Sequence, residues 1–128
     1  LLETEGWEPL PLREAGAEEE AQADGPDDGG AVDPHAWLDP AVAAAWTGAI
    51  AEALAEADPE RAETYRANAG AAQARLLGLG QDLRARIAPL AGRGFVAGHD
   101  AYQYLERAAG LTGAGAVADA SGAAPSPG

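Results

Sequence analysis

Residues 59–90 read PERAETYRANAGAAQARLLGLGQDLRARIAPL and carry the longest helical pattern of the chain. Apolar side chains recur there every three or four positions, as on one side of an α-helix: Tyr65, Ala69, Ala72, Leu76, Leu79, Leu83, Ile87 and Leu90. Asp58 followed by Pro59 is a typical helix start. A helix of about 30 residues is about 45 Å long, whereas a small domain is only about 30 Å across. We therefore predict a rod that joins two bodies.

A shorter helix is predicted upstream, from Pro40 to about Ala57. Asp39 is a candidate N-cap, with Pro40 at the first helical position. Apolar residues recur at helical spacing over about four turns: Val42, Trp46, Ile50, Leu54 and Ala57. These residues form one apolar stripe along the predicted helix.

The segment after the long helix has the pattern of a small α/β unit. Residues 95–98 (FVAG) predict a short buried strand, and residues 111–118 are a candidate second strand. Asp100 is a candidate N-cap for a helix over residues 101–109, and Gly110 is a candidate C-terminal stop. Helix, strand, helix and strand in this order predict an α/β fold with a parallel sheet, in a chain that is mostly helical.

The two ends of the chain lack such periodicity. Residues 1–13, with Trp7 and a Pro-Leu-Pro-Leu stretch, suggest an extended segment. Residues 14–28 contain seven acids and no base, which predicts a solvated loop or a disordered insertion. Residues 121–128 (SGAAPSPG) predict a further loop.

The composition excludes several classes of function. The 128 residues carry a formal net charge of −13, so no basic stripe is present to bind nucleic-acid phosphates or anionic lipid. The absence of cysteine rules out disulfides, thiolate metal sites and thiol catalysis. No apolar run is long enough to span a membrane. The first residues do not resemble a signal peptide, so we expect either a cytosolic protein or a chain without its true N-terminus, and the motifs below favour the second.

Two histidines stand at junctions between elements. His35 precedes the helix that starts at Pro40, and His99 follows a predicted strand at the end where open α/β sheets bind ligands. Neutral imidazole is a good ligand for zinc and other transition metals. The functional hypothesis is that both histidines bind one metal ion, although 64 positions separate them. The structural alternative is that each is a packed, hydrogen-bonded side chain.

Two other functions stay open from the residues alone. In a zinc hydrolase, His35 and His99 would hold the metal and Asp100 would act as the base, so changing Asp100 to Asn would abolish turnover. In an acidic helical interaction module, both histidines would be structural, and removal of metal would leave stability unchanged. Asp39 and Asp100 are better explained as helix caps than as bases.

Two motifs resemble those of a known family. Residues 33–40, Asp33-Pro-His-Ala-Trp-Leu-Asp-Pro40, are similar to the D-P-H-x-W-L-[DS]-P signature of metal-binding receptors of bacterial ABC importers, the cluster A-I or ZnuA-like zinc group. Residues 95–102 (FVAGHDAY), followed by Tyr104-Leu105-Glu106 and Gly110-Leu111, resemble the second histidine motif of that family. The resemblance covers about residues 31–111.

The resemblance implies a two-lobe α/β fold in which one long helix joins the lobes and the metal lies between them, with no catalytic chemistry. His35 would be the ligand from the N-terminal lobe and His99 the ligand from the C-terminal lobe. The residues expected to hold these ligands or to pack beside them are Asp33, Trp37, Asp100 and Tyr102. Manganese-selective relatives tend to have glutamate at the His99 position, so the resemblance favours Zn²⁺ over Mn²⁺.

The resemblance also implies a division of the chain and a place of action. The expected parts are residues 1–30 (end of the N-terminal lobe and acidic loop), 31–58 (last part of that lobe), 59–92 (linker helix) and 93–128 (start of the C-terminal lobe). Such a receptor works in the periplasm or another extracytoplasmic space and delivers zinc to the importer's permease. A surface adhesin on the same scaffold is a variant that the sequence does not separate from it.

Two further ligands of the family's site are expected outside this chain. They are a histidine near the start of the N-terminal lobe and a carboxylate late in the C-terminal lobe. The chain is therefore interpreted as an internal fragment. Because a zinc site usually has about four ligands, we expect this piece to bind zinc weakly or not at all.

Overall fold

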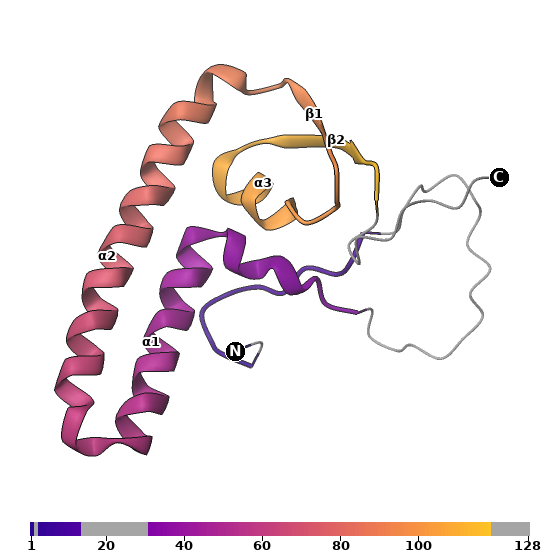
Figure 1. The fold of residues 1–128 in the computed structure, drawn as a ribbon. Helices are drawn as coiled ribbons and strands as arrows, with labels where there is room; N and C mark the ends of the chain where they lie inside the picture. The colour runs from indigo at the N-terminus through magenta and orange to yellow at the C-terminus, as the bar shows by residue number, and fades with distance from the viewer. Residues whose placement is uncertain (2, 14–30, 119–128) are drawn as a thin grey trace.

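The computed structural model describes residues 1, 3–13 and 31–118 (Figure 1). The acidic segment at residues 14–28 and the tail at residues 121–128, both expected to be loops, lie outside the described residues. The described elements are, in order, the 3-10 helix η1 (Pro34–Leu38), α1 (Pro40–Ala57), η2 (Pro59–Arg61), α2 (Ala62–Ile87), η3 (Ala88–Leu90), β1 (Gly94–Ala97), α3 (Gln103–Ala109) and β2 (Thr112–Ala116). No helix in this part of the chain is long and apolar enough to cross a membrane.

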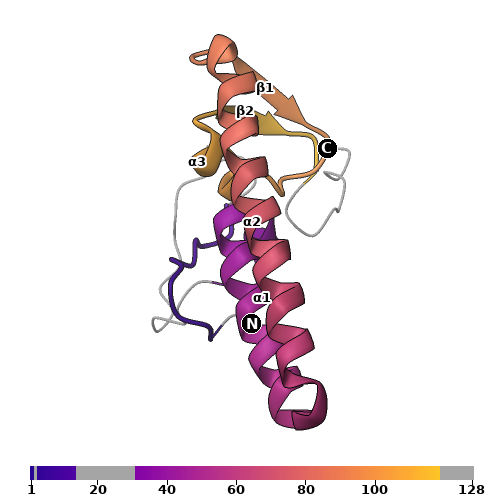
Figure 2. The same ribbon diagram turned by 90° about the vertical axis from the view of Figure 1, so that its left-hand side faces the viewer.

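The long helix is present as predicted. α2 has 26 residues, which corresponds to about 39 Å, and the single turns η2 and η3 continue the helical path at its two ends. Figures 1 and 2 show α1 running beside the first part of α2, whereas the last part of α2 continues past α1 to the sheet. The helix therefore connects a helical hairpin to the unit formed by β1, α3 and β2.

Small residues bring α1 and α2 close together. The buried face of α1 includes Ala44, Ala51 and Ala55. Gly48 lies so near α2 that a Cβ on it would be 2.8 Å from Nε2 of Gln73. The same nitrogen donates a hydrogen bond of 3.1 Å to the carbonyl oxygen of Ala44. Short side chains and the hydrogen bond of Gln73 therefore lie in the contact between the two helices.

Several residues of the two predicted apolar stripes are exposed in the structure. Ile50 and Leu54 are 46% and 44% exposed, and Ala57 is exposed, while the alanines directly after Ile50 and Leu54 are buried. Helices that approach through small residues leave no room for branched side chains in the contact, so the larger residues face outward. Leu79 in α2 and Leu90 in η3 are also exposed, by 48% and 46%.

Two predicted helix ends are confirmed. The side chain of Asp39 accepts a hydrogen bond of 2.8 Å from the backbone N–H of Ala41, and proline follows Asp39 at the first position of α1. Gly110 ends α3 with φ of +73°, a left-handed conformation that favours glycine. Both signals act within a few residues, so they do not depend on the rest of the fold.

The prediction that Asp100 caps the third helix is wrong. α3 begins at Gln103, and no side chain caps its first turn. Asp100 belongs to the turn after β1, where its backbone N–H donates to the carbonyl oxygen of Ala118 at 3.0 Å. Its carboxylate forms an ion pair with the guanidinium of Arg13, at 3.4 Å and 87 positions earlier in the chain.

β1 and β2 form a parallel pair joined by α3, as predicted. Gly94 is opposite Thr112 and Ala97 is opposite Ala116, with a register shift between Phe95 and the next residue. The strands are shifted or shortened by one or two residues at each end relative to the predicted 95–98 and 111–118. One residue, Gly98, separates the carboxyl end of β1 from His99.

The core lies between η1, α1 and α3. Its buried residues are Ala36, Val42, Trp46 and Tyr104, against which Trp7 and Leu10 pack. The rings of Trp7 and Trp46 meet edge to face, with centroids 5.4 Å apart. Pro11 pairs with Val32 in an isolated antiparallel bridge. The N-terminal segment therefore packs on the core, and Pro11 lies beside the backbone that precedes His35.

Candidate metal centre

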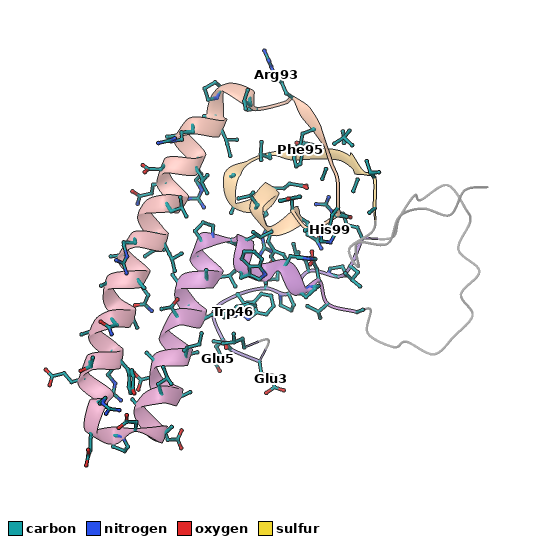
Figure 3. All side chains as sticks on the ribbon, in the orientation of Figure 1. Glu3, Glu5, Trp46, Arg93, Phe95 and His99 are labelled. Carbon is teal, nitrogen blue, oxygen red and sulfur yellow. The ribbon has the colours of Figure 1, made fainter. Side chains whose placement is uncertain are left out.

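His35 and His99 lie side by side. His35 belongs to η1, and His99 follows β1; their ring centroids are 5.0 Å apart and their planes make an angle of 76°. Figure 3 shows His99 at the place where the connection after β1 comes down to the η1 region. The His35 side chain is 16% exposed and His99 is half-buried. The structure therefore brings together the two residues that the sequence singles out.

Asp33 holds the His35 ring. Its carboxylate is 1% exposed, and its Oδ1 lies 2.8 Å from the backbone nitrogen and 2.7 Å from Nδ1 of His35. An ionised carboxylate only accepts hydrogen bonds, so this geometry favours the tautomer of His35 with the proton on Nδ1. The Nε2 atom of the neutral ring is then the one with a free electron pair for a metal ion.

The other residues expected near the ligands have different surroundings. Trp37 and Tyr102 are 56% and 38% exposed. Asp39 caps α1 through the hydrogen bond described above. Asp100 lies next to His99 in sequence and is occupied by its ion pair with Arg13. The residue with a clear structural link to a histidine ligand candidate is thus Asp33.

Gln103 is a site residue that the sequence analysis did not find. Its Nε2 donates a hydrogen bond of 2.8 Å to the carbonyl oxygen of Pro11 and a second one to Oδ2 of Asp33. A glutamine at the start of a short helix has no distinctive pattern, and its partners lie 92 and 70 positions away. Its position four residues after His99 is the one signal that it shares the neighbourhood of the site.

Arg13 is a second residue that the sequence analysis missed. Its guanidinium binds the carboxylate of Glu106 through Nη2–Oε2 and Nη1–Oε1 distances of 2.6 Å and 3.1 Å, and Nη1 also reaches Asp100. The hydrogen bonds to Glu106, above all, raise the pKa of Arg13. These contacts tie the N-terminal segment to α3 beside His99.

This arrangement offers two imidazoles as candidate metal ligands. His35 and His99 are the two histidines of the chain. Among residues 1, 3–13 and 31–118, no group of three or more His, Cys, Asp or Glu side chains could hold a metal ion. Two imidazoles supply half of the roughly four ligands of a typical zinc site. Asp100, the base that a hydrolase would need, is held by Arg13.

Comparison with known proteins finds relatives that are named for metal uptake or metal binding. The family described as "ZnuA: Zinc-uptake complex component A periplasmic" matches residues 2–128. The high-affinity zinc uptake system protein ZnuA of Paracoccus denitrificans (strain Pd 1222) is 43% identical over 95 residues, which cover 74% of this chain and 29% of that protein. The iron-binding protein YfeA of Yersinia pestis is 38% identical over 106 residues, covering 81% of this chain and 30% of that protein.

Solved structures agree with the fold. A crystal structure of a Zn(II)-bound variant of AdcAII of Streptococcus pneumoniae matches with a TM-score of 0.71 and 34% identity, covering 83% of this chain and 40% of that chain. The resemblance to a two-lobe metal-binding fold is therefore confirmed. The present chain spans less than a third of the length of the two curated relatives above. Because the family match extends over nearly the whole sequence, this chain belongs to the ZnuA family, a family of solute-binding proteins and not of enzymes.

Proposed function

We propose that this chain is part of the solute-binding component of a metal ABC importer, which captures Zn²⁺ between two lobes and delivers it to a membrane permease. One observation carries the proposal: the rings of His35 and His99, from segments 64 positions apart, have centroids 5.0 Å apart. The hydrogen bond from His35 Nδ1 to Asp33 supports it, because metal-binding histidines usually donate their other ring N–H to a carboxylate or carbonyl.

The proposed ligands are Nε2 of His35 and the imidazole of His99. Two imidazoles favour zinc over manganese, which prefers oxygen ligands. The Paracoccus relative is named for zinc uptake and the Yersinia relative for iron binding, so the named metal differs among the relatives. We place zinc first because its usual sites combine histidines with few oxygen ligands.

The proposed division of the chain follows its elements. Residues 1–58 would belong to the N-terminal lobe, 59–92 to the linker helix and 93–128 to the start of the C-terminal lobe. The site would then form where the lobes meet, with the remaining ligands from other parts of the receptor. A periplasmic or extracytoplasmic location follows from the family description. With two imidazoles alone, zinc binding by this chain is expected to be weaker than micromolar.

Zinc titration followed by NMR tests the proposal. In this chain, zinc should shift the ring signals of His35 and His99 together, and His35→Ala should abolish the shift at His99. Gln81→Ala, an exposed change on α2, serves as the control and should leave both shifts intact. Shifts of the two rings at clearly different zinc concentrations would refute a shared site. Sub-micromolar, His99-dependent affinity in calorimetry would refute the expected weakness of this piece.

A further inference from the structure

The side chain of Gln103 joins three parts of the chain that are far apart in sequence. Gln103 is the first residue of α3, and its Nε2 donates to the carbonyl oxygen of Pro11 at 2.8 Å and to Oδ2 of Asp33. A backbone carbonyl and an ionised carboxylate can only accept hydrogen bonds, so both require the NH₂ group of the amide to face them. The orientation of the Gln103 amide is therefore determined by its partners.

The Gln103 amide is one of the hydrogen-bond donors to the buried carboxylate of Asp33. The Asp33 carboxylate is 1% exposed, and His35 supplies two donors to its Oδ1, at 2.8 Å and 2.7 Å. Gln103 supplies the donor to Oδ2. A buried carboxylate is costly unless its oxygens are hydrogen-bonded. Without the Gln103 donor, Asp33 would have to turn toward other donors or water and would weaken its bond to the His35 ring.

The placement of Gln103 links the two histidines. It lies four residues after His99, on the helix that follows the same turn, and its amide holds the carboxylate that holds His35. We propose that Gln103 is a positioning residue: through Asp33 it keeps the proton on Nδ1 of His35 and leaves Nε2 free beside His99. Its importance for metal binding rests on the function proposed above, whereas its effect on the His35 proton does not.

The chain offers a matched control. Gln73 is also half-buried and also ties two elements, since its Nε2 donates to the carbonyl oxygen of Ala44 at 3.1 Å. It lies on α2 and touches neither Asp33 nor His35. Gln73→Ala therefore removes a comparable glutamine tether without changing the surroundings of the histidine. A role that is only structural would make the two glutamines equivalent.

Long-range ¹H–¹⁵N NMR of the full, metal-free chain shows which ring nitrogen of His35 carries the proton. The wild-type chain should show the proton on Nδ1. Gln103→Ala should raise the fraction of the Nε2–H form about fivefold, the factor that a typical hydrogen bond provides. Gln103→Glu, which keeps the shape but has no N–H, should act in the same direction. Gln73→Ala should leave the ratio unchanged. A folded Gln103→Ala chain with the wild-type ratio would overturn the proposal.

A second measurement needs no variant. In the wild-type chain, the side-chain NH₂ of Gln103 should exchange with water at least tenfold more slowly than that of the exposed Gln81, because two acceptors hold it. Equal exchange rates would overturn the proposal even where Gln103→Ala does not fold. Zinc titration separates this proposal from the proposed function. If Gln103→Ala changes the proton position on His35 but zinc does not shift the two rings together, Gln103 is a positioning residue and the shared metal site is refuted. If zinc shifts the two rings together but Gln103→Ala leaves the proton position unchanged, the role of Gln103 is refuted.

Discussion

Arg13 and Glu106 are 93 positions apart in the chain, and their side chains meet through two hydrogen bonds of 2.6 Å and 3.1 Å. Glu106 is 12% exposed and Arg13 is 37% exposed, so the pair lies at the edge of the core. The same guanidinium reaches Asp100 at 3.4 Å. This contact fastens the N-terminal segment to α3, beside the turn that carries His99.

Loss of the ion pair between Arg13 and Glu106 should destabilise the chain modestly. Arg13→Gln should lower the free energy of unfolding by about 1 kcal/mol or less, because solvent screens a partly exposed pair even when its geometry is bidentate. Urea denaturation measures the change. Arg61→Gln is the control: Arg61 is 72% exposed and pairs with Asp58, so its loss should have a smaller effect. Equal losses of unfolding free energy in the two variants would show that the Arg13–Glu106 pair contributes no more than an ordinary surface ion pair.

The ion pair between α1 and α2 should make stability depend on pH. Arg66 donates to Glu52 at 2.7 Å and 2.9 Å, and chiefly through these hydrogen bonds the pKa of Glu52 falls below its usual 4.5. A lowered pKa in the folded state means that the stabilisation is complete above the unfolded pKa and is lost as the pH falls through the folded pKa. The wild-type chain should therefore exceed Glu52→Gln in urea midpoint at pH 7, and the gap should close near pH 3. Both side chains are well exposed, so the effect should be small.

Glu56, one turn further along α1, provides the control for this pH effect. At pH 7, Glu56→Gln should change the urea midpoint less than Glu52→Gln does. A gap between wild type and Glu52→Gln that persists at pH 3 would mean that the change acts through packing or helix propensity and not through the ion pair.

Glycines on the two helices should respond differently to alanine. Gly70 lies within α2, and a Cβ on it would meet nothing within 4 Å, so Gly70→Ala should stabilise the chain by about 0.5–1 kcal/mol. Gly48→Ala has the same helix propensity in its favour but displaces Nε2 of Gln73 from its bond to Ala44, so the net gain should be close to zero. Thermal unfolding of the two variants measures these changes in stability. A larger stability gain for Gly48→Ala than for Gly70→Ala would show that α1 and α2 have room for a Cβ at position 48.

Removal of one hydroxyl should weaken the core. Tyr104 has no exposed surface, and its hydroxyl oxygen accepts a hydrogen bond of 2.7 Å from the backbone N–H of Leu10. Tyr104→Phe leaves this N–H without its partner and should cost about 1–3 kcal/mol in chemical denaturation. Tyr65→Phe, whose hydroxyl donates to Asp58 at 2.9 Å nearer the solvent, should cost less. A Tyr104→Phe chain as stable as wild type would show that water replaces the hydroxyl.

Much of the fold could be predicted because its signals are local. Asp39 and the following proline start α1, and Gly110 ends α3, through contacts or backbone angles within a few residues. The 26-residue α2 follows from its composition and periodicity. The buried faces were less predictable: Ile50 and Leu54 have the right spacing but point outward, because the face of a helix that is buried depends on the shape of its partner.

For the site, the sequence by itself determined which residues have the chemistry of metal ligands, namely His35 and His99 within two short motifs. Only the tertiary structure decided that their rings lie 5.0 Å apart and that Gln103 reaches the carboxylate beside His35. It also decided that Asp100 pairs with Arg13 and does not cap α3. The physical reason is range: caps and helical periodicity act over a few residues, whereas these contacts join side chains that only the packing of α1, α2 and α3 brings together.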